Sequence, residues 1–114
     1  PGPKPHSLLQ RHGLTPDQPV LLTISRLDRT ERYKGHDEVL QTLPALRRSF
    51  PNLRYLIGGR GDYADTLRQR AMDLGVADLV TFTGFIRDAE LPAYFQLCDA
   101  FIMPSRKEGF GIVF

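Results

Sequence analysis

The chain has 114 residues, of which 41% are hydrophobic and 25% are charged, and these ordinary globular values predict one domain with one buried core. Its 15 basic and 13 acidic residues leave a formal net charge of +2, and without a stripe of Lys and Arg this balance argues against a nucleic-acid partner. No run approaches the roughly 20 apolar residues that a membrane span needs.

The single cysteine, Cys98, excludes an intramolecular disulfide and fits a reducing compartment, where we expect it to be a small core residue. The chain does not begin with Met and shows no signal-peptide pattern. We therefore interpret it as a piece of a longer, cytoplasmic protein, with peripheral membrane attachment of the full-length protein as an alternative.

The predicted elements alternate between short apolar runs and amphipathic stretches. Residues 1–18 are expected to form a linker and a short helix, over 6–12, that lead into the domain. Strands are predicted over 20–24, 53–57, 79–83 and 100–103, where apolar and β-branched residues are continuous. Three further helices are predicted. The first begins at about His36, and Pro44 should kink or split it. The other two follow Asp62 and Asp88, which are expected to be their N-caps.

This order of elements predicts an α/β fold. Short connections and apolar strands favour a three-layer, doubly wound, Rossmann-like parallel sheet with helices on both faces. The commonest strand order for such a sheet is 3-2-1-4, which makes the first and fourth strands neighbours at the point where the order reverses. We expect residues 1–114 to form this one domain.

The loops after the four strands carry the candidate site, because ligands of such sheets bind outside the carboxyl ends of the strands. Arg26 and Lys34 follow the first strand, and Glu108 follows the fourth, ahead of glycines expected to open a helix. Two cations and a glycine-opened helix N-terminus suit a diphosphate, and a carboxylate suits the hydroxyls of a sugar. The combination predicts a nucleotide-diphosphate-sugar site.

Each residue also has a plainer interpretation. Arg26 and Lys34 fit a solvated loop, residues 58–61 fit a tight turn, and Glu108 fits a carboxylate stabilised by a helix dipole. His36, at a helix start, is expected on the surface. Tyr63 stands where the third glycine of G-x-G-x-x-G would be, which disfavours a nicotinamide dinucleotide, and the histidines and the cysteine have no metal-ligand spacing.

Taken in order, these segments resemble family 4 of the retaining, nucleotide-sugar-dependent glycosyltransferases, which have the GT-B fold. The family's G/S-R-L and K-G segment is matched by residues 24–27 and 33–36, and its strand ending in G-x-G by residues 56–61. Its F-x-G-x-V/I segment is matched by residues 80–86, and the P-S and E-G-F-G half of its E-x7-E signature by residues 101–111. The second glutamate of that signature would fall two residues beyond Phe114.

The resemblance implies a role for each matching residue. Arg26 and Lys34 would hold the donor diphosphate, and Glu108 would bind hydroxyls of the transferred sugar, as the three catalytic candidates. The substrate-binding candidates are Gly109, Phe110 and Gly111 beside the sugar and phosphates, Gly84, Phe85 and Ile86 around the base, and Gly59. The resemblance implies no metal and no other cofactor. The nucleotide-diphosphate sugar is the substrate.

The resemblance also implies that this chain is the truncated C-terminal, donor-binding half of an enzyme that transfers a hexosyl group with retention. The acceptor would bind an N-terminal domain absent from this chain, so the chain alone is expected to be inactive and to self-associate through its truncated edge. A nucleotide-sugar epimerase of related architecture and a non-catalytic nucleotide-sugar-binding or scaffold domain are the alternatives.

Overall fold

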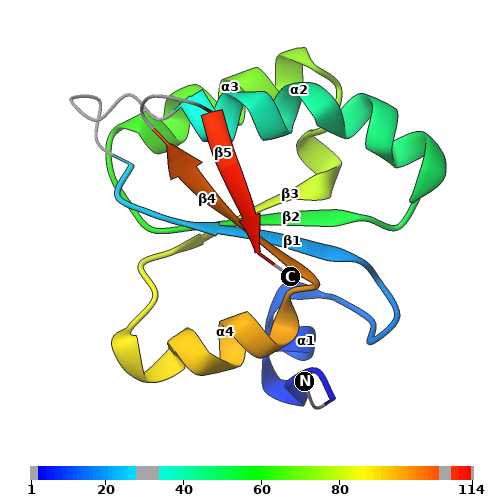
Figure 1. The fold of residues 1–114 in the computed structure, drawn as a ribbon, viewed down its shortest axis with the longest axis vertical. Helices are drawn as coiled ribbons and strands as arrows, with labels where there is room; N and C mark the ends of the chain where they lie inside the picture. The colour runs from blue at the N-terminus through cyan, green and yellow to red at the C-terminus, as the bar shows by residue number, and fades with distance from the viewer. Residues whose placement is uncertain (1–2, 28–33, 106–108, 114) are drawn as a thin grey trace.

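The computed structural model describes residues 3–27, 34–105 and 109–113, with side chains described for 3–27 and 35–102. Its elements, in chain order (Figure 1), are α1 (His6–His12), β1 (Val20–Ile24), α2 (Lys34–Ser49), β2 (Arg54–Gly58), α3 (Tyr63–Asp73), η1 (Ala77–Leu79), β3 (Val80–Gly84), η2 (Asp88–Glu90), α4 (Leu91–Leu97), β4 (Ala100–Ser105) and β5 (Gly109–Val113). From α1 to β4 the described elements therefore alternate between helix and strand, as predicted.

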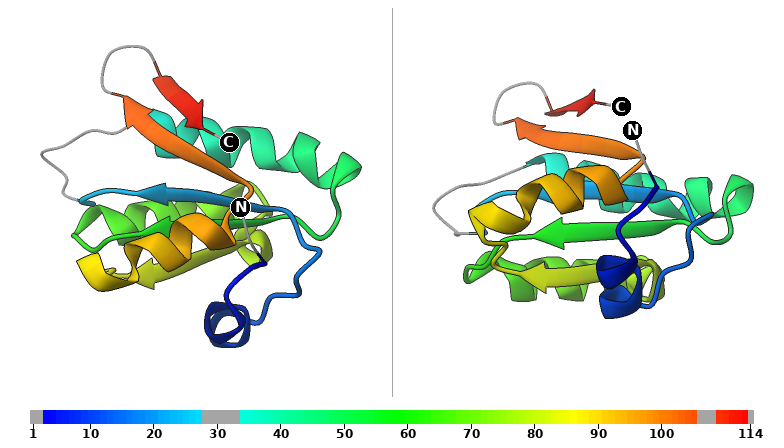
Figure 2. Two further views of the ribbon diagram at one scale, coloured as in Figure 1. Left: turned by 60° about the horizontal axis from the view of Figure 1, so that its bottom comes forward. Right: turned by 90° about the horizontal axis from the view of Figure 1, so that it is seen from below.

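The strands form one sheet in the order β3-β2-β1-β4-β5, and the two views of Figure 2 show this succession from one edge to the other. β1 pairs in parallel with both β2 and β4, and β2 pairs in parallel with β3. The predicted doubly wound parallel sheet and its 3-2-1-4 order are confirmed. The carboxyl ends of β1, β2 and β3 consequently lie at one edge of the fold.

The last described segment differs from its prediction, because the residues expected to open a helix form β5. β5 runs antiparallel to β4, with Ser105 opposite Gly109 and Phe101 opposite Val113. Glycine is a poor helix former, and Phe, Ile and Val favour strands. Pairing with β4 also satisfies backbone groups along both strands. The predicted helix N-terminus over residues 109–111 is therefore wrong.

Helices cover both faces of the sheet, with α2 and α3 on one side and α1 and α4 on the other (Figure 1). Each face has its own buried apolar cluster. The α2 and α3 side includes Val39, Leu40, Leu43, Tyr55, Ile57, Leu67 and Ile102, and the α1 and α4 side includes Leu8, Leu9, Leu22, Leu56, Tyr94 and Leu97. Strands buried on both faces explain why their sequences read as continuous apolar runs.

The predicted helix ends and breaks agree with the structure in some places and differ in others. Gly13 and Gly75 follow α1 and α3 with φ of 66° and 73°, as predicted for helix terminators. α2 continues through Pro44 without splitting, because the packing of its apolar face outweighs one missing backbone hydrogen bond. Asp88 starts η2 rather than capping α4, which begins at Leu91.

Cys98 is partly buried against the α1 and α4 cluster, close to the core position expected for it, and burial raises the pKa of its thiol. Among the described residues, no helix combines the length and apolar character needed to cross a membrane.

Candidate functional site

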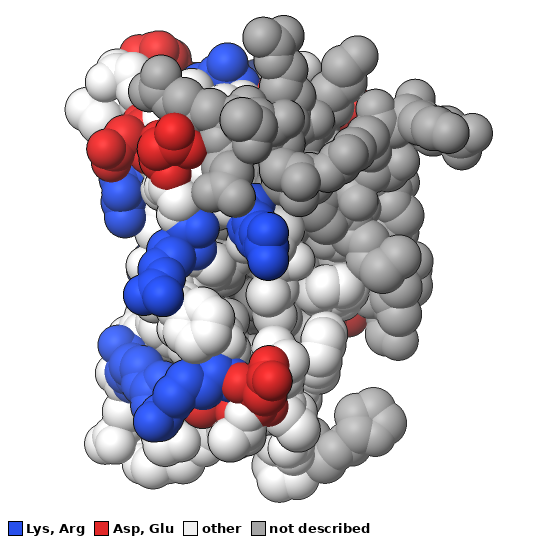
Figure 3. All heavy atoms as spheres, turned by 90° about the vertical axis from the view of Figure 1, so that its left-hand side faces the viewer, with Lys and Arg blue, Asp and Glu red and all other residues white. Residues whose placement is uncertain are grey.

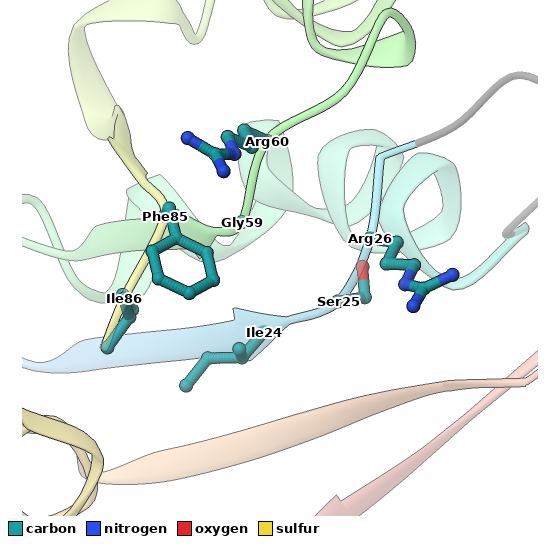
Figure 4. Close-up of a pocket in the computed structure, with 7 residues that line it drawn as sticks. All are labelled: Ile24, Ser25, Arg26, Gly59, Arg60, Phe85 and Ile86. Carbon is teal, nitrogen blue, oxygen red and sulfur yellow. The ribbon is translucent and has the colours of Figure 1, made fainter. Parts of the chain in front are cut away.

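A pocket of about 380 Å³ lies where β1, β2 and β3 end, in the region predicted for a ligand. Its lining residues come from three consecutive strand ends, as the close-up in Figure 4 shows: Ile24, Ser25 and Arg26 follow or end β1, Gly59 and Arg60 follow β2, and Phe85 and Ile86 follow β3. Its volume falls within the range of small-molecule sites.

Backbone contacts through Gly59 hold these three strand ends together. The Gly59 amide donates to the Gly84 carbonyl at 2.8 Å, and the Ser25 amide donates to the Gly58 carbonyl at 3.1 Å. Gly59 has a φ of +117°, and a Cβ at this position would lie 1.8 Å from the Ser25 carbonyl oxygen. Only glycine fits there, and Gly59 both bridges to Gly84 and lines the pocket.

Two arginines at the pocket, Arg26 and Arg60, are exposed. Arg26 and Arg60 have no carboxylate within 4.0 Å among the residues that the structure describes, whereas Arg11, Arg47, Arg68, Arg70 and Arg87 are paired with Asp or Glu. Figure 3 views the side on which the strand-end loops lie, and basic side chains are spread across it. An anionic ligand suits such a site.

The pocket also offers apolar surface. Ile86 is buried with an exposed fraction of 6%, Ile24 is partly buried, and Phe85 is 59% exposed. In Figure 4 the ring of Phe85 lies beside Arg60, and Arg26 lies across the pocket from both, near Ser25. A flat apolar group beside an anion therefore matches this lining.

A buried polar contact fixes the end of β1 against α2. His36 is fully buried, with an exposed fraction of 0%, and its Nε2 lies 3.0 Å from the Ser25 Oγ. The prediction that His36 is a surface residue was wrong, because the first turn of α2 packs against the end of β1. This contact ties Ser25, and with it the neighbouring Arg26, to the helix on which Lys34 is the first residue.

The structure places the predicted site residues in three groups. Arg26, Gly59, Phe85 and Ile86 line the pocket, and Gly84 adjoins it through its bond to Gly59.

Lys34 begins α2, but its side chain lies outside the described residues, as does Glu108 as a whole. The structure tests neither role.

Gly109, Phe110 and Gly111 lie in β5, opposite Ser105, Pro104 and Met103. Their predicted place at a helix N-terminus is wrong, whereas their contact with a donor stays a prediction.

The sequence did not single out Ile24, Ser25 or Arg60 as site residues. Arg60 stands between Gly59 and Gly61, and a positive charge between two glycines at a strand end could have identified it from the sequence. Ser25 occupies the G/S position of the G/S-R-L segment beside Arg26, whereas Ile24 gave no signal, since it resembles any other residue of a buried strand. Among the described residues, no group of three His, Cys, Asp or Glu could hold a metal ion.

Comparison with curated proteins shows related mannosyltransferases. The chain is 44% identical over 103 residues to the GDP-mannose-dependent α-(1-6)-phosphatidylinositol monomannoside mannosyltransferase of Mycolicibacterium smegmatis, covering 90% of this chain and 26% of that protein. The Mycobacterium tuberculosis protein of the same name is 40% identical over 121 residues, covering 100% of this chain and 31% of that protein. The chain thus spans about a quarter to a third of these relatives.

Solved structures share the fold. WaaG, a glycosyltransferase involved in lipopolysaccharide biosynthesis, superposes with a TM-score of 0.71 at 24% identity, over 88% of this chain and 26% of WaaG. Anabaena HepE, solved in complex with UDP and glucose, gives a TM-score of 0.65 at 27% identity, over 83% of this chain and 25% of that one. The model of the family described as "Glycosyl transferases group 1" matches residues 7–114, and the chain therefore belongs to the group 1 glycosyl transferases.

Proposed function

We propose that this chain is the donor-binding domain of a retaining glycosyltransferase that moves a mannosyl group from GDP-mannose to an acceptor. The observation that carries the proposal is the pocket at the carboxyl ends of β1, β2 and β3, with Arg26 and Arg60 beside an apolar lining. The named activity of the two mycobacterial relatives supplies the donor. The rest of the enzyme, including an N-terminal acceptor-binding domain, lies outside this chain.

In this proposal Arg26 and Lys34 neutralise the diphosphate, which leaves with the bond electrons as the sugar transfers. Charge-assisted hydrogen bonds from fixed cations stabilise the transition state more than the bound donor, because negative charge grows on the leaving oxygen. The backbone bonds through Gly59 and the Ser25–His36 contact keep the end of β1 in place for this task. No step is assigned to a metal ion, so we expect turnover to persist in EDTA.

The acceptor is proposed to be lipid-linked, since the relatives' names specify a phosphatidylinositol monomannoside. A full-length protein that works in the cytoplasm and attaches peripherally to a membrane would fit such an acceptor.

The test uses the full-length protein with GDP-mannose and a phosphatidylinositol mannoside acceptor, followed by product analysis. We expect GDP and an α-mannoside, the anomer that retention requires. An epimerised sugar nucleotide without glycoside would favour the epimerase alternative, and donor binding without either product would favour a binding or scaffold domain. A thermal-shift panel should show GDP-mannose stabilising the protein by about 2.7 kcal/mol at 100 times its Kd.

Glu108 provides a separate test of sugar recognition. Glu108→Gln keeps the size of the side chain but removes the charge that would bind hydroxyls and stabilise positive charge on the sugar. We expect turnover to fall by one to three powers of ten, roughly 1.4 to 4 kcal/mol, with GDP affinity changed less than threefold. Turnover within about twofold of the wild type would remove Glu108 from the reaction.

A further inference from the structure

Arg60 and Phe85 meet at the pocket because each follows one of the two bridged glycines. Gly59 and Gly84 form an isolated antiparallel bridge, with the Gly59 amide 2.8 Å from the Gly84 carbonyl. The next residue of each loop projects from this bridge, and the Arg60 Cζ lies 5.0 Å from the centroid of the Phe85 ring. Figure 4 shows the guanidinium and the ring at the same side of the pocket.

A second arginine on a phenylalanine shows what is unusual about this pair. The Arg68 Cζ lies 4.6 Å from the Phe82 ring centroid, and its Nη1 also lies 3.1 Å from the Asp65 Oδ1. Arg68 therefore has its charge compensated within the fold. Among the described residues Arg60 has no carboxylate partner, and its ring partner Phe85 is 59% exposed. The N–H donors of Arg60 and the apolar face of the Phe85 ring are thus available side by side.

We propose that Arg60, oriented by the Phe85 ring, is a specificity-determining residue that selects a guanine base in the donor. This inference rests on the proposed function, since it assumes that a nucleoside diphosphate occupies the pocket. Contact with the ring restricts the planar guanidinium and leaves its N–H groups at the edge. Ile24 and Ile86 provide the apolar surface against which the flat face of a base packs.

Hydrogen-bonding chemistry distinguishes the bases. Guanine presents two neighbouring acceptors, O6 and N7, which match two parallel N–H groups of a guanidinium. Adenine presents a donor next to its N7, so one of the two bonds is lost and two donors face each other. Uracil is smaller and offers a single carbonyl on the corresponding edge. Arg60 should therefore favour guanine over both, independently of the diphosphate.

The experiment measures the affinities of GDP, ADP and UDP for the full-length protein by isothermal titration calorimetry. We expect wild-type protein to prefer GDP, and Arg60→Ala to weaken GDP binding at least tenfold while ADP and UDP binding changes less than threefold. Arg60→Lys keeps the positive charge without the paired N–H groups, and should lose most of the preference. Arg87→Ala is the matched control, because Arg87 is an exposed, Glu90-paired arginine on the loop after β3, which also carries Phe85, and it does not line the pocket.

Three results would overturn the inference. An equal loss for all three nucleotides in Arg60→Ala would show that Arg60 binds phosphate, and unchanged affinities would show that it is a surface residue. Retention of the GDP preference in Arg60→Lys would equally show that charge alone is enough. Failure of the wild type to bind any nucleoside diphosphate would instead reject the proposed function, so the two failures are distinguishable.

Discussion

The two ends of the sheet are built in opposite ways. At the amino ends of the strands, side chains bind the backbone and each other. Asp99 Oδ2 accepts hydrogen bonds from the Val20 amide at 2.7 Å and from Lys4 Nζ at 2.9 Å. Near the start of β3, Arg47 Nη2 lies 2.6 Å from Asp78 Oδ1, and this hydrogen bond lowers the pKa of the Asp78 carboxyl.

At the carboxyl ends of β1, β2 and β3, backbone hydrogen bonds join the loops that carry the pocket arginines. Gly59 bonds to Gly84 and packs directly on Ser25, so three loops are joined without using a charged side chain. Arg26 and Arg60 consequently extend from a fixed backbone without an internal counter-charge among the described residues. Charged side chains at the amino end thus bind within the fold, whereas the two pocket arginines at the carboxyl end have no carboxylate partner among the described residues.

The largest effect should come from breaking the backbone joint at the carboxyl end. Gly59→Ala places a Cβ 1.8 Å from the Ser25 oxygen and keeps a φ of +117°, so we expect a loss of at least about 3 kcal/mol of unfolding free energy. Gly75→Ala is the control, because its φ is +73° but no atom lies within 4 Å of its Cβ, and it should cost about 1 kcal/mol. Urea unfolding measures both, and equal losses would contradict the close packing of Gly59 on Ser25.

The next effect concerns ligand affinity. Arg26→Ala should weaken donor binding by roughly 1.5 to 3 kcal/mol, because a charge-assisted hydrogen bond to the diphosphate is lost. Folding should be little changed, since Arg26 has no carboxylate partner in the part of the chain that the structure describes.

Arg47→Ala is the counterpart at the amino end. Its exposed ion pair should contribute at most about 1 kcal/mol to stability and nothing to donor affinity. Calorimetric titration with GDP-mannose, together with urea unfolding, separates these outcomes. A drop in donor affinity for Arg47→Ala, or none for Arg26→Ala, would remove the distinction between the two ends.

The sequence was sufficient for the architecture and for part of the site. The runs 20–24 and 53–57 could be recognised as strands because both faces of each strand are buried, and the strand order followed from general rules for parallel sheets. Arg26 and Phe85 could be placed at the ligand edge for the same reason. Local pattern and topology together therefore indicated the edge of the sheet at which the pocket lies, whereas its lining from β1, β2 and β3 comes from the structure.

What could not be predicted depends on partners that are distant in the chain. β5 forms because residues 109–113 pair with β4, and the sequence Gly-Phe-Gly-Ile-Val does not by itself specify a strand without that pairing. His36 is buried because the chain folds it back onto Ser25, 11 residues earlier. Arg60 and Phe85 meet only through the bridge between Gly59 and Gly84, which the sequence does not encode locally.

A smaller effect is expected at the amino end from Asp99→Ala. The variant removes the acceptor of the Val20 amide, and Val20 is fully buried, so about 1 to 2 kcal/mol of unfolding free energy should be lost. Asp99→Asn keeps a carbonyl acceptor for this amide and loses only the charge facing Lys4, so it should lose clearly less. Identical losses in urea unfolding would show that the ion pair, rather than the backbone cap, is what matters. Neither variant should alter the preference among nucleotides.

The smallest expected effect is a pH dependence of folding that leaves the pocket unaffected. His12 Nε2 lies 2.8 Å from the Tyr94 hydroxyl, and this contact joins α1 to α4. Burial, together with the positive charge of Arg11, lowers the pKa of His12 below 6.5, although the negative charge of Glu90 acts in the opposite direction. The unfolded chain therefore binds a proton more readily than the folded chain as the pH falls through about 6.5, and stability must decrease over that range. Urea unfolding at pH 7.5 and 5.5 should show this decrease in the wild type and a smaller one in His12→Gln, which cannot titrate. Because His6 and His36 remain in both proteins, the difference between them isolates His12, and an equal decrease would assign the pH dependence elsewhere.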